Sequence, residues 1–196
     1  MRSVLLFVTF FVITTSYAQK EMRLTMHGGF GTENNIGVAA FFGGLGIEKP
    51  IHKNWSIAFD VTRFTTNIYE VYDKSFDNEE RIYKSWFVTP KASYQLAGNN
   101  NSFCSLKLLA GPSLKIYKLK SLSTALVTYH PNGTRTADPG TIRWYQENKS
   151  NISLYTGLNL NFVISKKLDA GLILDTYSHE ILIEHFFPGI KFQYKL

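Results

Sequence analysis

Cysteine and long apolar segments are scarce in this sequence, and each shortage excludes a class of protein. Cys104 is the single cysteine among 196 residues, so the chain cannot form an internal disulfide. Beyond the first 18 residues no run of 18 apolar residues occurs; the longest such stretch, 36–47, is short and contains four glycines. A transmembrane helix is therefore not expected in that part.

The N-terminal segment has the layout of a secretory signal peptide. Arg2 precedes an apolar run over residues 4–13, and the small-residue site Ser16-Tyr17-Ala18 follows the run. The run is too short to span a bilayer, which favours a cleaved signal peptide over a membrane anchor. We therefore expect a signal peptide at 1–18 and one mature domain at 19–196. A buried N-terminal helix is the alternative interpretation.

The chain is basic, with 21 Lys and Arg against 15 Asp and Glu and a formal charge of +6. A basic balance can indicate nucleic-acid binding. Here the basic residues are dispersed, the densest group being Lys115, Lys118 and Lys120, and the chain is predicted to be exported. The charge therefore favours attraction to anionic lipid head groups over binding of nucleic acid.

Alternation of apolar and polar residues runs through most of the chain, whereas helical periodicity is scarce. In the last nine residues, PGIKFQYKL, the side chains of Ile190, Phe192 and Tyr194 fall on one face, and Lys191 and Gln193 fall on the other. Eight alternating segments predict eight β-strands, at 21–30, 37–49, 55–61, 85–97, 105–117, 151–164, 168–177 and 188–196.

The connections between these strands differ in length. They are tight at 50–54, 98–102 and 165–167, short at 32–35, and longer at 68–80, 119–150 and 177–183. Short periplasmic turns on one side and longer outer loops on the other are the pattern of outer-membrane barrels. The segment 119–150 is expected to form a β-hairpin above the membrane; the alternative is two more spanning strands, which would make ten.

The location of the apolar face separates two kinds of barrel. A soluble barrel turns this face inward and a lipid-embedded barrel turns it outward, and both give alternation. Predicted strands of about 9–13 residues match the roughly 9–11 residues that a tilted strand needs to cross a bilayer. The polar faces are expected to form a paired network inside a narrow lumen, made of Arg23, Glu48, Asp60, Lys91, Lys107, Asp169, Asp175, Lys191 and Lys195.

Aromatic residues gather near the ends of the predicted strands, as the interfacial girdles of membrane barrels do. The girdle expected beside the tight turns consists of Trp55, Tyr94, Phe192 and Tyr194. The girdle expected beside the longer loops consists of Phe30, Tyr83, Trp86 and Tyr117.

The end of the chain carries a resemblance. The segment GIKFQYKL resembles the C-terminal assembly signal of Gram-negative outer-membrane β-barrels, with Phe192, Tyr194 and Leu196 at the matching alternate positions. It departs from that pattern at Leu196, where a terminal Phe or Tyr is usual. Over the mature part, the chain resembles the outer membrane protein β-barrel domain family, including PorT-like proteins. The resemblance implies an integral outer-membrane barrel and lies in the overall pattern, without an invariant motif.

One segment, DTYSHEILIEH at 175–185, contains candidate catalytic residues. Asp175, Ser178 and His179 would be the acid, nucleophile and base of a lipid-modifying enzyme, such as a lipid A hydrolase or acyltransferase. Neighbouring strand residues point to opposite faces, which favours a polar hairpin tip instead. The segment also lacks the H-E-x-x-H zinc motif, so no metal site and no cofactor are predicted.

The sequence thus predicts an all-β fold, an eight-stranded antiparallel up-and-down transmembrane barrel. The favoured function is a non-enzymatic outer-membrane protein with a structural or surface-interaction role through its outer loops. No large open pore is expected, because side chains fill an eight-stranded interior. The expected partners are outer-membrane lipid, lipopolysaccharide and the assembly machinery; no extracellular partner is specified. A lipid-modifying enzyme and a soluble exported ligand-binding barrel are the alternatives.

Overall fold

A computed structural model describes residues 22–34, 37–68, 81–98, 102–124, 126–132, 135–137, 141, 143–179 and 182–196. The predicted signal peptide at 1–18 lies outside the described residues. Within them, no helix is both long enough and apolar enough to cross a membrane.

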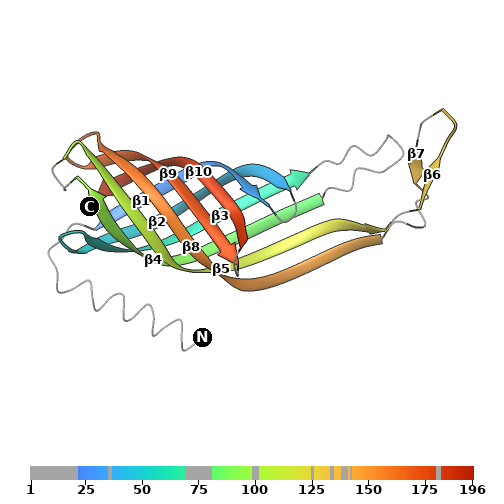
Figure 1. The fold of residues 1–196 in the computed structure, drawn as a ribbon, viewed down its shortest axis with the longest axis horizontal. Coiled ribbons are helices and arrows are strands. Elements are labelled where there is room, and N and C mark those ends of the chain that lie inside the picture. Colours follow the sequence, from blue (N-terminus) through green and yellow to red (C-terminus); the bar gives the residue numbers. More distant parts are fainter. Residues whose placement is uncertain are drawn as a thin grey trace.

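Eight strands close into one antiparallel barrel, in the order β1-β10-β9-β8-β5-β4-β3-β2 (Figure 1). Two short strands, β6 and β7, form a separate sheet. The eight-stranded prediction is therefore confirmed and the ten-stranded alternative is wrong. The strands are β1 Arg23–Glu33, β2 Val38–His52, β3 Trp55–Ile68, β4 Arg81–Ala97, β5 Cys104–Thr124, β6 Val127–Tyr129, β7 Arg135–Ala137, β8 Arg143–Val163, β9 Leu168–His179 and β10 Leu182–Lys195.

The connection at 119–150 has the paired arms of the predicted hairpin, whereas the connection at 177–183 differs from the prediction. Strands β5 and β8 stay paired as far as Thr124 and Arg143, so both arms of the predicted loop at 119–150 are extended strand. Figure 1 shows these two strands running on past the rest of the barrel toward the β6–β7 hairpin. The predicted longer loop at 177–183 is instead a tight connection, because β9 continues to His179 and β10 begins at Leu182.

The barrel closes where the first strand meets the last. β1 pairs with β10 from Arg23↔Lys195 to Glu33↔His185, and the Leu196 amide donates a 2.9 Å hydrogen bond to the Met22 carbonyl. The Lys195 amide donates to the Lys167 carbonyl in the β8–β9 turn, so the chain end lies beside the tight turns. Closure leaves no unpaired sheet edge around the barrel wall, which a lipid environment requires.

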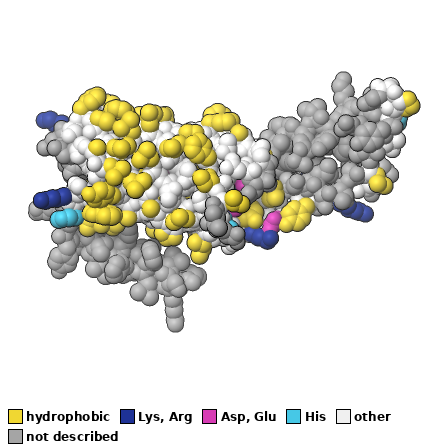
Figure 2. Space-filling model, in the orientation of Figure 1, with side chains coloured by type: hydrophobic (Ala, Val, Ile, Leu, Met, Phe, Trp, Pro, Cys, Tyr) yellow, Lys and Arg dark blue, Asp and Glu magenta, His cyan; other side chains and the backbone are white. Residues whose placement is uncertain are grey.

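Burial in this barrel is the reverse of that in a soluble protein. The outward side chains Phe41 and Ile152 are 78% and 72% exposed, while the inward Glu48 and Lys107 are 1% and 4% exposed. Figure 2 shows hydrophobic side chains spread over the barrel wall, with Lys and Arg near its ends. The alternation therefore puts the apolar face outward and the charged face in the lumen, as expected for a barrel surrounded by lipid.

The expected girdles are present except at Tyr83 and Tyr117, which both have the inward parity of their strands, and Tyr117 packs against the buried core. Trp55 and Tyr94 face outward beside the tight turns, with ring centroids 4.9 Å apart, and Trp86 faces outward nearer the other end. The assignment of Tyr83 to the outer girdle is wrong, because its side chain is only 2% exposed and lies inside the barrel. Tyr83 shares the inward parity of Ser85 and Phe87 on β4, whereas Trp86 has the outward parity.

Candidate functional site

The lumen is the first candidate site, and Glu48 on β2 is the centre of its charged network near the tight turns. Lys107 Nζ lies 2.5 Å from Glu48 Oε1, and Lys191 Nζ lies 3.5 Å from Oε2. The Gln193 amide donates to Oε2 over 2.8 Å, and Arg23 is the register partner of Glu48 on β1. One carboxylate thus brings together groups from β1, β5 and β10.

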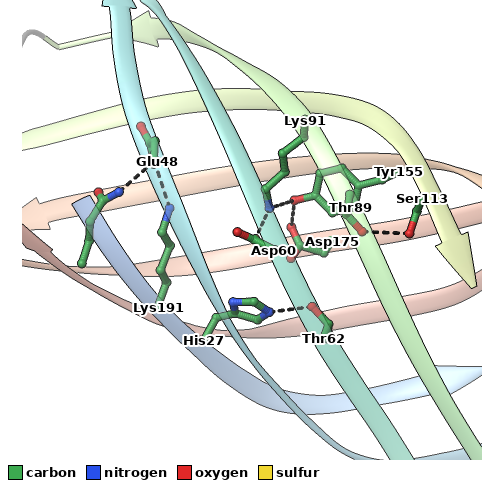
Figure 3. Close-up of polar contacts among 11 residues, drawn as sticks. His27, Glu48, Asp60, Thr62, Thr89, Lys91, Ser113, Tyr155, Asp175 and Lys191 are labelled. Carbon is green, nitrogen blue, oxygen red and sulfur yellow. Dashed lines mark hydrogen bonds and ion pairs between the residues drawn. The ribbon is translucent and has the colours of Figure 1, made fainter. Parts of the chain in front are cut away.

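A second network lies beside the first (Figure 3). Lys91 on β4 pairs with Asp60 on β3, and its ammonium group donates to the Tyr155 hydroxyl over 3.2 Å. That hydroxyl donates in turn to Asp175 Oδ1 over 2.6 Å. All four side chains are buried. The chain of contacts therefore joins strands β3, β4, β8 and β9 across the lumen, because each group completes the hydrogen bonding of the next.

Ion pairs also occupy both ends of the lumen. Beside the tight turns, Lys195 Nζ lies 3.0 Å from Asp169 Oδ1. Toward the other end, Lys115 Nζ lies 2.9 Å from Glu184 Oε2. The β9–β10 register shifts between Ile183 and His185, and this bulge leaves both Glu184 and His185 buried. Bulges commonly re-aim side chains in this way near barrel rims.

The structure places every residue of the predicted lumen network inside the barrel. Glu48 contacts Lys107 and Lys191, and Lys91 links Asp60 to Asp175 through Tyr155. The buried His27 bonds to Thr62 through its Nε2 atom over 2.9 Å. Sequence parity found the charged members of the network, whereas their partners across the lumen follow from the register and tilt of the strands.

An aromatic layer, absent from the sequence prediction, fills the lumen above the charged networks. Phe187 stacks on Phe42 and Phe64, with ring centroids 4.6 and 5.3 Å away, and Phe87 lies 4.1 Å from Tyr177. The Tyr83 hydroxyl and His185 Nε2 are 3.1 Å apart. The signal in the sequence was a run of aromatic residues on the otherwise polar parity. The layer consists of Phe42, Phe64, Tyr83, Phe87, Tyr177, His185 and Phe187, all buried.

The three residues of the enzyme alternative do not gather into one site. Asp175 lies on the inward face of β9, where it accepts the hydrogen bond from Tyr155. Ser178 has the opposite parity on the same strand, so its side chain projects to the other face of the sheet. His179 shares the inward parity but lies four residues further along the strand than Asp175. Within the described residues, no group of three or more His, Cys, Asp or Glu is placed to hold a metal ion.

The proposed assembly residues lie on the outer wall. Phe192, Tyr194 and Leu196 are 40%, 43% and 60% exposed. Their inward neighbours Lys191 and Gln193 contact Glu48. The two faces of the terminal strand therefore have separate roles, one toward the surroundings of the barrel and the other toward the charged network.

No protein family model matches the chain, and no curated protein matches it. Among solved structures, the chain is similar to Ail, the attachment invasion locus protein of Yersinia pestis, in complex with the heparin analogue sucrose octasulfate. The two share 14% identity and a TM-score of 0.57, and the match covers 91% of this chain and 100% of that one. Neisserial surface protein A is similar at 12% identity and a TM-score of 0.56, and the match covers 91% of this chain and 98% of that one. The N-terminal β-barrel domain of Pseudomonas aeruginosa OprF is similar at 11% identity and a TM-score of 0.54. That match covers 91% of this chain and 98% of the domain.

Identities this low establish the fold alone. The chain has the fold of small Gram-negative outer-membrane β-barrels, as the sequence predicts. The finer resemblance to PorT-like proteins stays a prediction.

Proposed function

We propose that this protein is a non-enzymatic integral protein of the outer membrane, with a structural or surface-interaction role carried by the strands and loops at the end opposite the tight turns. The observation that carries the proposal is the reversed burial of the barrel, with apolar side chains outside and ion pairs inside. Such a wall is stable against hydrocarbon, whereas in water it would leave a large apolar area exposed.

The filled lumen supports a role other than transport through an open pore. The charged networks join strands across the barrel, and the aromatic layer lies in series with them. An eight-stranded barrel has room inside for little more than its own side chains. A solute would have to displace both layers in order to pass.

The extended part of β5 and β8 supports a surface role. The β8–β9 pairing ends at Leu154↔Ser178, while the β5–β8 pairing continues to Thr124↔Arg143. We call residues 117–124 and 143–149, together with the β6–β7 hairpin, the outer arm. Under the proposal this arm stands outside the membrane, as the longer loops of such barrels do, and offers a contact surface to the cell exterior.

A membrane fractionation tests the proposal. The protein is expected in the outer-membrane fraction, and its mobility on a gel is expected to differ between unboiled and boiled samples, because a folded barrel resists the detergent until it is heated. Recovery in the periplasmic fraction without detergent, and without a mobility shift, would contradict the proposal. A Ser178→Ala variant, read out as lipid A modification in cells, tests the enzyme alternative, because Ser178 is its nucleophile and projects away from the buried networks.

A further inference from the structure

The outer wall of the barrel carries a cationic patch just beyond the Trp86 girdle. Register pairing puts Lys84 on β4 directly opposite Lys118 on β5. One step toward the tight turns, Trp86 pairs with Ile116 on one side and with Arg63 on the other. The Arg63 guanidinium carbon lies 5.3 Å from the centre of the Trp86 ring. We call Arg63, Lys84 and Lys118 the basic patch.

Within the described residues, the basic patch has no acidic partner on its own face. Six of the seven Asp and Glu side chains in the described residues are buried in the barrel, and the seventh, Glu147, pairs with Lys149. The Lys149 ammonium holds the pKa of Glu147 below its ordinary value through this hydrogen bond, so the pair stays ionised at neutral pH. Within the described part of the chain, no ion pair involves Lys84 or Lys118.

Two lysines directly opposite each other on neighbouring strands repel, and the pairing costs stability unless an anion neutralises it. Arg63 is the diagonal neighbour of Lys84, which gives a separation of roughly 7–8 Å. Its Nε donates to the Thr65 hydroxyl over 3.1 Å, which directs the guanidinium toward the row of Lys84. Three cationic side chains thus lie on the neighbouring strands β3, β4 and β5 at this level of the outer wall.

A groove and an apolar wall adjoin the basic patch. The groove has a volume of about 470 Å³ and is lined by Lys84, Trp86, Ile116, Lys118, Asn148 and Lys149, among others. Below it, the outward side chains Leu114 and Ile152 are register partners and are 42% and 72% exposed. The face therefore changes from apolar to cationic along the strands, which matches an amphiphile with acyl chains and an anionic head.

The depth of the patch fits this arrangement. Trp86 and Tyr94 mark two girdles on β4, and the nine residues from one to the other match the roughly 9–11 residues of a tilted membrane strand. Lys84 lies one outward position beyond Trp86, which is the level of the lipid head groups. From these observations we propose that the basic patch and the adjoining groove bind the phosphorylated head group of an outer-leaflet lipid. The inference rests on the proposed membrane location.

Fluorescence of Trp86 tests the inference. Trp55→Phe and Trp144→Phe leave Trp86 as the only tryptophan of the three in the chain. The protein is placed in phosphatidylcholine bilayers that contain brominated phosphatidic acid, or brominated phosphatidylcholine in the reference sample. Bromine quenches tryptophan on contact, so the ratio of quenching reports which lipid occupies the groove. A preference of about thirtyfold for the phosphomonoester lipid is expected, since two surface lysines contribute about 1 kcal/mol each toward anionic lipid.

Matched variants separate the site from general attraction. In the double variant Lys84→Gln with Lys118→Gln, brominated phosphatidic acid is expected to quench Trp86 no more than brominated phosphatidylcholine does. Lys53→Gln with Lys166→Gln makes the same change of charge at exposed positions near the tight turns, and the preference is expected to stay. Gel mobility before and after boiling confirms that each variant is folded and inserted.

Two results would overturn the inference while leaving the proposed membrane location intact. One is an inserted barrel in which both pairs of variants show the same lipid preference as the parent. The other is loss of the lipid preference when inorganic phosphate is added at the same concentration, which would assign the patch to a free anion instead of a lipid. A protein that stays soluble without lipid or detergent would contradict the proposed function itself.

Discussion

At the residue scale, the lumen depends on charges that only other lumen residues neutralise. Glu48 is 1% exposed and has Lys107, Lys191 and Gln193 within contact distance. Taking a charge out of water costs several kcal/mol, and close partners offset that cost. A buried network of this kind adds stability only while it is complete, so the loss of one member leaves the others without counter-charge.

Glu48→Gln is therefore expected to lower the free energy of unfolding by about 3–5 kcal/mol, because Lys107 and Lys191 lose their carboxylate while they remain buried. The measurement is urea unfolding in lipid vesicles, followed by tryptophan fluorescence. A double variant, Glu48→Gln with Lys107→Gln, is expected to lose less than the sum of the two single variants, because removing Lys107 also removes an uncompensated charge. Additive losses would contradict a coupled network.

At the element scale, the seam between β1 and β10 is shaped by glycine. A Cβ atom on Gly189 would lie 2.4 Å from the Gly28 carbonyl oxygen and 2.9 Å from the Phe42 ring. The missing side chain lets the Phe42 ring lie over the seam, where it stacks on Phe187. The seam and the aromatic layer therefore depend on each other.

Gly189→Ala is expected to destabilise the barrel by about 1–3 kcal/mol, because the backbone on the other side of the seam cannot move away easily. Gly43→Ala is the matched control on β2, since its Cβ would meet nothing closer than the His27 carbonyl oxygen at 3.8 Å. The measurement is the free energy of unfolding of both variants in lipid vesicles, and Gly189→Ala is expected to have the lower value. Equal values for the two would show that the seam tolerates a side chain.

The β6–β7 hairpin of the outer arm is an element whose loss the barrel is expected to tolerate. β6 and β7 pair only with each other, and the barrel closes without them. Replacing residues 126–141 with a short Gly-Ser linker should leave the temperature of the gel mobility shift unchanged, because few barrel contacts are removed. A shift lost at a lower temperature would show that the hairpin supports the barrel, and a surface role for the hairpin alone would then be wrong.

Most of these strands could be predicted from the alternation of apolar and polar residues, and the strand ends that it missed have physical causes. Within the barrel wall, each residue faces either outward or into the lumen, so polarity reports the face and the eight strands follow from it. Past Tyr117 the apolar–polar alternation is irregular, so the prediction placed these residues in a loop, whereas β5 and β8 continue beyond the rest of the barrel (Figure 1). The short β9–β10 connection was missed because polar residues such as Ser178 and His179 read as a loop.

At the scale of the whole molecule, the interior has two layers in series, ion-paired toward the tight turns and aromatic toward the outer arm. The aromatic layer escaped prediction because Phe64 and Phe187 lie outside the predicted strands at 55–61 and 188–196, although both belong to strands in the structure. Hydrophobic side chains on the lumen parity pack against one another only once the barrel is closed, and a single-strand pattern does not contain that contact.

The two layers predict that the protein does not conduct ions steadily. In planar bilayers the parent barrel is expected to give no stable conductance steps, since every axial path meets buried side chains. Phe187→Ala is expected to remain closed as well, although it removes ring contacts to Phe42 and Phe64, because the network around Glu48 and Lys91 still fills the lumen. An open porin inserted under the same conditions controls for insertion. Stepwise conductance from the parent protein would mean that the layers open together, and a transport role would then replace the structural one.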